Sequence, residues 1–292
     1  MKKITLKTSA KINLTLDVTG IRDDGYHNIE SIFQSIGIYD IITVSRNRGS
    51  EINISCSDLS VPCDKRNIVY KAAEKFFAYT EKRSGLDIDI QKNIPSQAGL
   101  GGGSSDGAAV LTALNLLFKT NLTPESLIRI GSEVSADTPF FINGGTALVE
   151  GIGDSIKPIR FIPPTDFVIA KGKDGISTPS AYKHIDMLFD PKHPKTEKLL
   201  KAIDKGKFIN HCDLCGNLFE QVTDIDDIFE IKKKMIEMNA LSSVMSGSGA
   251  SVFGIFKNRY EAEHCAFELN RLFPFSTYCQ SVGQSIKIIS TN

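Results

Sequence analysis

The sequence predicts an α+β fold in two parts, and three observations lead to that prediction. The chain has 292 residues, enough for one large domain or two moderate ones. Strand-like and helix-like segments are mixed along it in an order that does not suit a single doubly wound sheet. The adjacent prolines Pro163 and Pro164 mark the best boundary. We therefore expect an N-terminal domain over residues 1–162 and a C-terminal domain over residues 163–292.

The first predicted elements are strands. Residues 11–18 alternate strictly, which places Lys11 and Asn13 side by side on a polar face. Residues 29–46, IESIFQSIGIYDIITVSR, read as further strand. Residues 67–85 have helical spacing and end at Gly85, a helix stop signal. The next segment, LDIDIQKNIPS, alternates again.

The remaining elements continue the mixed order. The segment AAVLTALNLLF is apolar nearly all round and predicts a buried helix. In LTPESLIRIGSEV, Thr123 is a natural N-cap and Pro124 suits the first helical position. GGTALVEGIGDSIKPI predicts two short strands about a glycine-rich turn. After the boundary we expect a strand at 166–171, several helices, a strand at 251–256, a helix at 259–273 and a strand at 276–282.

Composition argues against several functional classes. The 34 basic side chains equal the 34 acidic ones, which gives no support for a nucleic-acid or anionic-membrane partner. No apolar run is long enough to span a bilayer, and the N-terminus forms no signal-peptide block. Of six scattered cysteines only Cys212 and Cys215 form a C-x-x-C, and a structural zinc site normally needs a second pair. We predict a cytoplasmic protein with no metal on its cysteines.

A glycine-rich loop before the buried helix is the first candidate site. Residues 94–110, IPSQAGLGGGSSDGAAV, contain five glycines and three serines. A strand, such a loop and a helix start form an anion site, because free N–H groups converge there and the helix dipole adds about half a positive charge. The Walker A lysine and the dinucleotide fingerprint are both missing. The alternative is a tight connector in which Ser105 or Asp106 caps the helix.

Four segments together resemble the superfamily of galactokinase, homoserine kinase, mevalonate kinase and phosphomevalonate kinase, the GHMP kinases. PSQAGLGGGSSDGAA is similar to their second motif, and SAKINLTLDVTGIRDDGYHNIESIFQSI to the N-terminal signature of one member. SADTPFFINGGTALVEGIGDSI and VMSGSGASVFGIF resemble the third and fourth blocks. The resemblance implies a fold like domain 2 of ribosomal protein S5 in the N-terminal half and a ferredoxin-like C-terminal half, with the active site in the cleft between them.

The resemblance also implies the ligands. ATP would be the co-substrate, accompanied by Mg²⁺, and the acceptor a small alcohol. The Lys-x-Asn strand, the Gly-Tyr-His turn and the Ala-Asp-x-Pro-Phe segment narrow this to a polyol linked to cytidine diphosphate. We expect neither a nucleic-acid nor a membrane partner, and a monomer or a weak homodimer.

Catalytic roles follow from the matched positions. Lys11 and Asp137 stand where the family's lysine and aspartate meet the acceptor hydroxyl. The carboxylate would take the hydroxyl proton, while the ammonium keeps that carboxylate ionised and offsets charge on the attacking oxygen. From spacing alone, Lys11 reads as a solvated strand lysine and Asp137 as the N-cap of a helix that starts at Thr138-Pro139.

Binding roles are implied in the same way. The residues matched to ATP are Pro95, Ala98, Gly99, Leu100, Gly101, Gly102, Gly103, Ser104, Ser105 and Asn67. Those matched to the substrate are Asn13, Tyr26, His27 and Tyr182, with the tyrosines stacking on the base. The plain alternatives are helix-capping serines, a tyrosine at the edge of the core and an ordinary hydrogen-bonded histidine. The segment 173–195 matches least, and GNLFEQV, around Asn217, matches a family segment without a chemistry we can derive.

Three other functions compete with this interpretation. Another small-alcohol kinase of the superfamily, such as a homoserine or mevalonate-type kinase, lacks a use for Tyr26 and His27. A non-catalytic nucleotide-binding regulator would have lost Lys11 or Asp137, and both are present. A Rossmann-type oxidoreductase requires the glycine fingerprint that is missing here.

Overall fold

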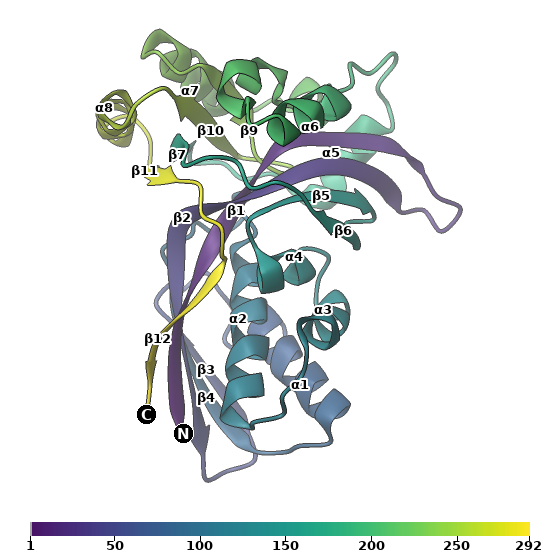
Figure 1. The fold of residues 1–292 in the computed structure, drawn as a ribbon, viewed down its shortest axis with the longest axis vertical. Coiled ribbons are helices and arrows are strands. Elements are labelled where there is room, and N and C mark those ends of the chain that lie inside the picture. The colour runs from purple at the N-terminus through teal and green to yellow at the C-terminus, as the bar shows by residue number, and fades with distance from the viewer. Residues whose placement is uncertain (1) are drawn as a thin grey trace.

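The computed structural model describes residues 2–292 and has two β-sheets with helices packed on them (Figure 1). The larger sheet has the order β12-β1-β2-β4-β3, with β5, β6 and β8 attached at its side. Its strands are β1 (Lys3–Ile21), β2 (His27–Asn47), β3 (Ile52–Cys56), β4 (Gly85–Gln91), β5 (Thr146–Gly151), β6 (Ser155–Pro158), β8 (Gly216–Asn217) and β12 (Ile286–Thr291). The smaller sheet is antiparallel, with the order β11-β7-β10-β9. Its strands are β7 (Asp166–Lys171), β9 (Ser242–Met245), β10 (Ser251–Phe256) and β11 (Phe275–Gln280).

Strands β1 and β2 form a long antiparallel ribbon that runs from one half of the molecule into the other (Figure 1). The pairing register shifts at three places along β1, and such bulges bend a strand and increase its twist. Residues 8–18 of β1 are buried without interruption. Lys11 and Asn13 lie side by side on one face, as predicted, but the alternative of a solvated strand lysine is wrong, because that polar face is buried.

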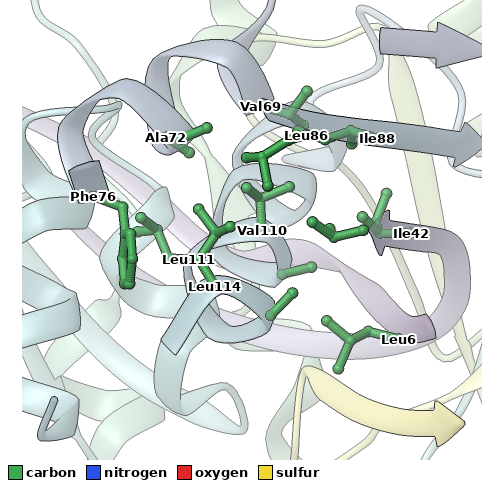
Figure 2. Packing of buried hydrophobic residues seen from close by; sticks show 14 of the residues in the cluster. Leu6, Ile42, Val69, Ala72, Phe76, Leu86, Ile88, Val110, Leu111 and Leu114 are labelled. Carbon is green, nitrogen blue, oxygen red and sulfur yellow. The ribbon is translucent and has the colours of Figure 1, made fainter. Parts of the chain in front are cut away.

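Four helices cover one face of the N-terminal sheet: α1 (Ile68–Thr80), α2 (Gly102–Leu117), α3 (Pro124–Ser132) and α4 (Thr138–Asn143). Helix α2 packs between α1 and β1, and its side chains Val110, Leu111 and Leu114 meet those of the sheet in one core (Figure 2). Thr123 caps α3 and accepts from Ser126 N, as predicted. Gly85 does not stop α1. That helix ends at Thr80, and Gly85 begins β4 where a side chain would overlap Asn47.

The C-terminal half places α7 (Asp226–Glu237) and α8 (Arg259–Asn270) on the smaller sheet, as Figure 1 shows. The segments between β7 and β9 hold α5 (Thr178–Ile185), α6 (Thr196–Asp204), η1 (Phe208–Leu214) and η2 (Leu218–Gln221). The predicted strands and helix of this half are all present. Two late segments, β8 and β12, return to pair with β1. The division at residue 162 stays a prediction.

Candidate active site

The glycine-rich loop connects β4 to α2, and the helix begins inside the glycine run. Its N-cap is Gly101, at φ 71°, and no side chain caps it. Gly99 has the same φ, so both positions need the left-handed freedom of glycine. The first N–H groups of α2 therefore lack a side-chain acceptor and face the open end of the helix, where an anion is favoured.

The capping alternative for Ser105 and Asp106 is wrong. Ser105 is fully buried, its Oγ donates to Ser9 O at 2.6 Å, and it lies 2.6 Å from Thr8 Oγ1. Ser105 therefore fastens α2 to β1 and does not face the loop's open side, so the structure gives no support to it as a phosphate ligand. Asp106 instead forms an ion pair with Lys92.

A cavity of about 480 Å³ lies over the loop. Its size suits a nucleotide. Of the residues predicted for ATP, the following line it: Asn67, Pro95, Ala98, Gly99, Leu100, Gly101, Gly102, Gly103 and Ser104. The side-chain amide of Asn67 bonds to the protein backbone at both ends: its Oδ1 accepts from Val69 N and its Nδ2 donates to Pro62 O. It shapes the wall as the N-cap of α1.

Sequence reasoning missed two basic residues of this cavity, Arg66 and Lys92. Arg66 is exposed and pairs with Asp64, which holds the pKa of that carboxyl at about 2. Lys92 is buried and bridges the carboxylates of Asp40 and Asp106. The only signal for Lys92 was its place directly after β4, at the entry to the loop.

The structure brings Lys11 and Asp137 together, although they are far apart in the chain. Lys11 Nζ lies 3.6 Å from Asp137 Oδ2 and donates to Asn13 Oδ1 at 2.7 Å. Lys11 N also donates to Leu100 O at 3.0 Å, which ties the strand to the glycine loop. The Lys11 side chain is 5% exposed and that of Asp137 29%. Asp137 stands at the start of α4 but makes no capping hydrogen bond, so its carboxylate is available at the cleft.

Burial dominates the electrostatics of this pair. Desolvation lowers the pKa of Lys11 below its usual range, and the Asp137 carboxylate opposes that fall. The ammonium also lies 4.5 Å from the centre of the Phe33 ring, whose face attracts a cation. An ammonium with a lowered pKa, next to a carboxylate that is partly exposed, can stabilise an oxygen that is losing its proton.

A group of ring side chains lies at the β1–β2 turn and α5. The rings of His27 and Tyr182 stack with centroids 4.6 Å apart. His27 Nε2 lies 2.6 Å from Asp186 Oδ1, and sequence reasoning gave no signal for this aspartate. Burial raises the pKa of Tyr182 to about 12, so its hydroxyl stays protonated. Tyr26, which precedes His27 in the chain, is 63% exposed.

The turn after β9 completes the site. Ser246 Oγ donates to Gly99 O at 3.0 Å, and Gly247 N donates to Asn13 Oδ1 at 2.9 Å. The turn therefore contacts both the glycine loop and the strand that carries Lys11. The turn carries the sequence SGSGAS, which belongs to the segment VMSGSGASVFGIF matched above, and it lies against the glycine loop.

Residues 2–292 hold neither a cluster of metal-binding side chains nor a membrane-spanning helix. No cluster of three or more His, Cys, Asp and Glu side chains there is arranged to hold a metal ion. Cys212 is buried as a free thiol with its Sγ 3.3 Å from Ile209 O. Over the same residues, no helix combines the length and apolar character needed to cross a bilayer.

Two family descriptions match the chain: "GHMP kinases N terminal domain" over residues 67–145 and "GHMP kinases C terminal" over residues 196–274. A protein of Alkaliphilus metalliredigens named 4-diphosphocytidyl-2-C-methyl-D-erythritol kinase is 41% identical over 286 residues, 97% of this chain and 98% of its own. A crystal structure of 4-(cytidine 5'-diphospho)-2C-methyl-D-erythritol kinase superposes with a TM-score of 0.81 and 27% identity, covering 96% of this chain and all of that one. The homoserine kinase of Cytophaga hutchinsonii, at 17% identity and a TM-score of 0.77 over 99% and 98% of the two chains, shares the fold.

Proposed function

Because this chain belongs to the 4-diphosphocytidyl-2-C-methyl-D-erythritol kinases of the GHMP superfamily, we propose that Lys11 and Asp137 carry its phosphoryl transfer. The enzyme phosphorylates the 2-hydroxyl of 4-diphosphocytidyl-2-C-methyl-D-erythritol with ATP, a step of the methylerythritol phosphate route to isoprenoids. The observation that carries the assignment of roles is the Lys11–Asp137 pair, set 3.6 Å apart beside the glycine loop.

The geometry supports an in-line transfer. The triphosphate of ATP would lie on the N–H groups at the start of α2, with its γ-phosphoryl group toward Lys11. The acceptor oxygen then forms its bond to Pγ while the bond from Pγ to the ADP oxygen breaks. Asp137 takes the hydroxyl proton, and Lys11 stabilises the oxygen that loses it. Most of the remaining barrier is lowered by positioning and charge neutralisation.

The residues present fit a magnesium ion carried by the nucleotide. Mg²⁺ binds proteins through one or two carboxylates and otherwise keeps waters and substrate phosphates as ligands. The hydroxyl of Ser104 on the cavity wall would be the protein's oxygen donor to such an ion, and the Asp137 carboxylate stays free for the hydroxyl proton. When bound, the ion would neutralise charge on the phosphates.

The cytidine end of the substrate is assigned to the aromatic group at the β1–β2 turn. Tyr26, His27 and Tyr182 are the proposed contacts there, while Asn13, next to Lys11 on β1, is the proposed contact near the acceptor hydroxyl. His27 and Tyr182 already lie together, and exposed Tyr26 is free to cover a base. An acceptor as small as homoserine or mevalonate would leave this group without a partner, which favours the cytidine substrate over the runner-up.

The experiment that tests the function is a coupled ADP-release assay with 4-diphosphocytidyl-2-C-methyl-D-erythritol, homoserine and mevalonate. We expect turnover with the first alone, and thermal stabilisation by cytidine diphosphate. Turnover of homoserine or mevalonate at a comparable rate contradicts the proposal. Cytoplasmic location and a monomer or weak homodimer stay predictions, and sedimentation of the purified enzyme tests the second.

A further inference from the structure

We propose that Asn217 is a positioning residue for the phosphoryl transfer, acting on Lys11 through the turn at Gly247 and the side chain of Asn13. The inference rests on the proposed roles of Lys11 and Asp137. It gives a task to the segment GNLFEQV, which the reaction as described above does not use.

Asn217 is a fully used hydrogen-bonding side chain. It is 6% exposed, lies on β8 next to Leu16 of β1, and begins η2. Its Nδ2 donates to Met245 O and to Gly247 O, both at 2.7 Å, while its Oδ1 accepts from Phe219 N at 3.0 Å. An amide is the one neutral side chain of this size that supplies two donors and an acceptor together.

Glu220 supports the same turn from one helical turn further on. Its Oε1 accepts from Met245 N at 2.6 Å, and its other oxygen pairs with Lys232 of α7. The backbone around Met245 is therefore held by an amide on one side and a carboxylate on the other. Asn217 and Glu220, three residues apart, therefore both fix the backbone at Met245.

The turn that they hold contacts both partners of the reaction. Gly247 N donates to Asn13 Oδ1 at 2.9 Å, and the same oxygen accepts from Lys11 Nζ at 2.7 Å. On the other side, a Cβ on Gly247 would lie 2.9 Å from Gly99 Cα, so the turn is packed directly on the glycine loop. A shift of this turn changes both the Lys11 ammonium and the phosphate-binding backbone.

The expected defect is in the chemical step. Without the two donors of Asn217, the carbonyls of Met245 and Gly247 lose their partners in a buried place and the turn moves. Asn13 Oδ1 then loses its fixed donor, and Lys11 is no longer held toward Asp137. Misplacement of a reacting group by about 1 Å can cost about 10²-fold in rate. The cytidine group is bound elsewhere, so the KM for the cytidine substrate should change little, while the shifted glycine loop should raise the KM for ATP.

The test compares Asn217→Asp with Gln221→Ala. Asn217→Asp keeps the shape and the acceptor but turns an oxygen toward two carbonyls, and we expect kcat to fall about 10- to 100-fold. The KM for the cytidine substrate should stay within about 3-fold. Gln221 also lies in η2, but its side chain is exposed and bonds to the Lys192 backbone. Gln221→Ala should therefore retain the wild-type kcat.

A double-mutant cycle separates positioning from general destabilisation. If Asn217 acts through Asn13, Asn13→Ala combined with Asn217→Asp should be no slower than Asn13→Ala alone. The inference is overturned if the rate losses of Asn13→Ala and Asn217→Asp multiply in the double variant. It is also overturned if a folded Asn217→Asp variant keeps the wild-type kcat. Glu220→Gln, which keeps an oxygen for Met245 N, is the milder variant should Asn217→Asp not fold, and a few-fold loss of kcat is expected. Failure of the proposed function differs, because the wild-type enzyme itself would then not turn over the cytidine substrate.

Discussion

At the residue scale, the pair Lys11–Asp137 combines a buried ammonium with a carboxylate that reaches the cleft. A buried lysine is costly unless paired, and here the pair, Asn13 and the Phe33 ring share the compensation. This environment explains why a strand lysine that looks solvated in sequence is held in one position. Its fixed ammonium is what the transfer requires.

Asp137→Asn should leave the fold intact and remove most of the turnover. The amide keeps the size of the side chain but cannot take the hydroxyl proton, a contribution of about 10²–10⁴-fold. The measurement is kcat from ADP release, with circular dichroism to verify folding. Near-normal turnover would eliminate Asp137 as the base.

Tyr26→Ala should raise the KM for the cytidine substrate and leave the KM for ATP unchanged. Stacking of an aromatic ring on a base is worth about 1–3 kcal/mol, or roughly 5- to 150-fold in affinity. Tyr260 on α8 is an exposed tyrosine outside the site, so Tyr260→Ala is the matched control. An unchanged KM in Tyr26→Ala would show that this ring does not contact the base.

At the element scale, the contact between the glycine loop and the turn after β9 leaves no room for side chains. A Cβ on Gly99 would overlap Ser246 O, and the residue has φ 71°. Gly25 has φ 81° with no atom within 4 Å of its added Cβ. Both alanine variants should lose about 1 kcal/mol from the left-handed backbone, and Gly99→Ala should lose clearly more. Urea unfolding measures the difference, and equal losses contradict the close packing.

The cluster of Lys92, Asp40 and Asp106 links β2, the end of β4 and α2. Burial raises the pKa of Asp106 well above its usual range, Lys92 opposes this and Asp40 adds to it. Asp106 Oδ1 is buried without a partner. Two carboxylates therefore share one ammonium beneath the glycine loop, which favours retention of a proton on Asp106.

Asp106→Asn should remove a pH dependence of stability. A carboxyl with a raised folded pKa stabilises the fold fully below its unfolded pKa of about 4, and that contribution is lost as the pH rises through the folded pKa. The side-chain amide of the variant cannot ionise. The free energy of unfolding of the variant should therefore rise relative to that of the wild type as the pH rises from about 4. Urea titrations across this range measure it. Asp87 on β4 is exposed with a lowered pKa, so Asp87→Asn should show the opposite trend. If the free energies of unfolding of Asp106→Asn and the wild type differ by the same amount at every pH, Asp106 does not retain a proton in the folded state.

At the scale of the whole molecule, the two halves share a hydrophobic core. Ile12 of β1 and Leu100 of the glycine loop belong to the same buried cluster as Ile169 and Phe253 of the smaller sheet. The site is thus built on side chains from both sides of the predicted domain boundary.

We therefore expect one cooperative unfolding transition for the whole chain. Phe253→Ala should move that transition as a unit, with a loss of about 3–5 kcal/mol. Calorimetry combined with circular dichroism measures it, and two separate transitions would show that the halves are independent.

The sequence predicted most elements and the loop because these depend on local patterns. Alternation identified β1, and the glycine run identified the place where backbone approaches backbone. The burial of both faces of β1, the inward turn of Ser105 and the pairing of His27 with Asp186 depend on segments distant in sequence. No local sequence pattern predicts those tertiary contacts. From the sequence, Asn217 was part of a segment that matched the family but had no assigned role. Its hydrogen bond to Gly247 O is seen only in the structure.

The ribbon of β1 and β2 has a consequence for motion in this enzyme. A clamshell opening of one half against the other would have to twist these two strands and strain the ladder between them. We expect the halves to stay rigid relative to each other during turnover. Binding and release of the nucleotide then depend on local movements within each half and not on a hinge between them.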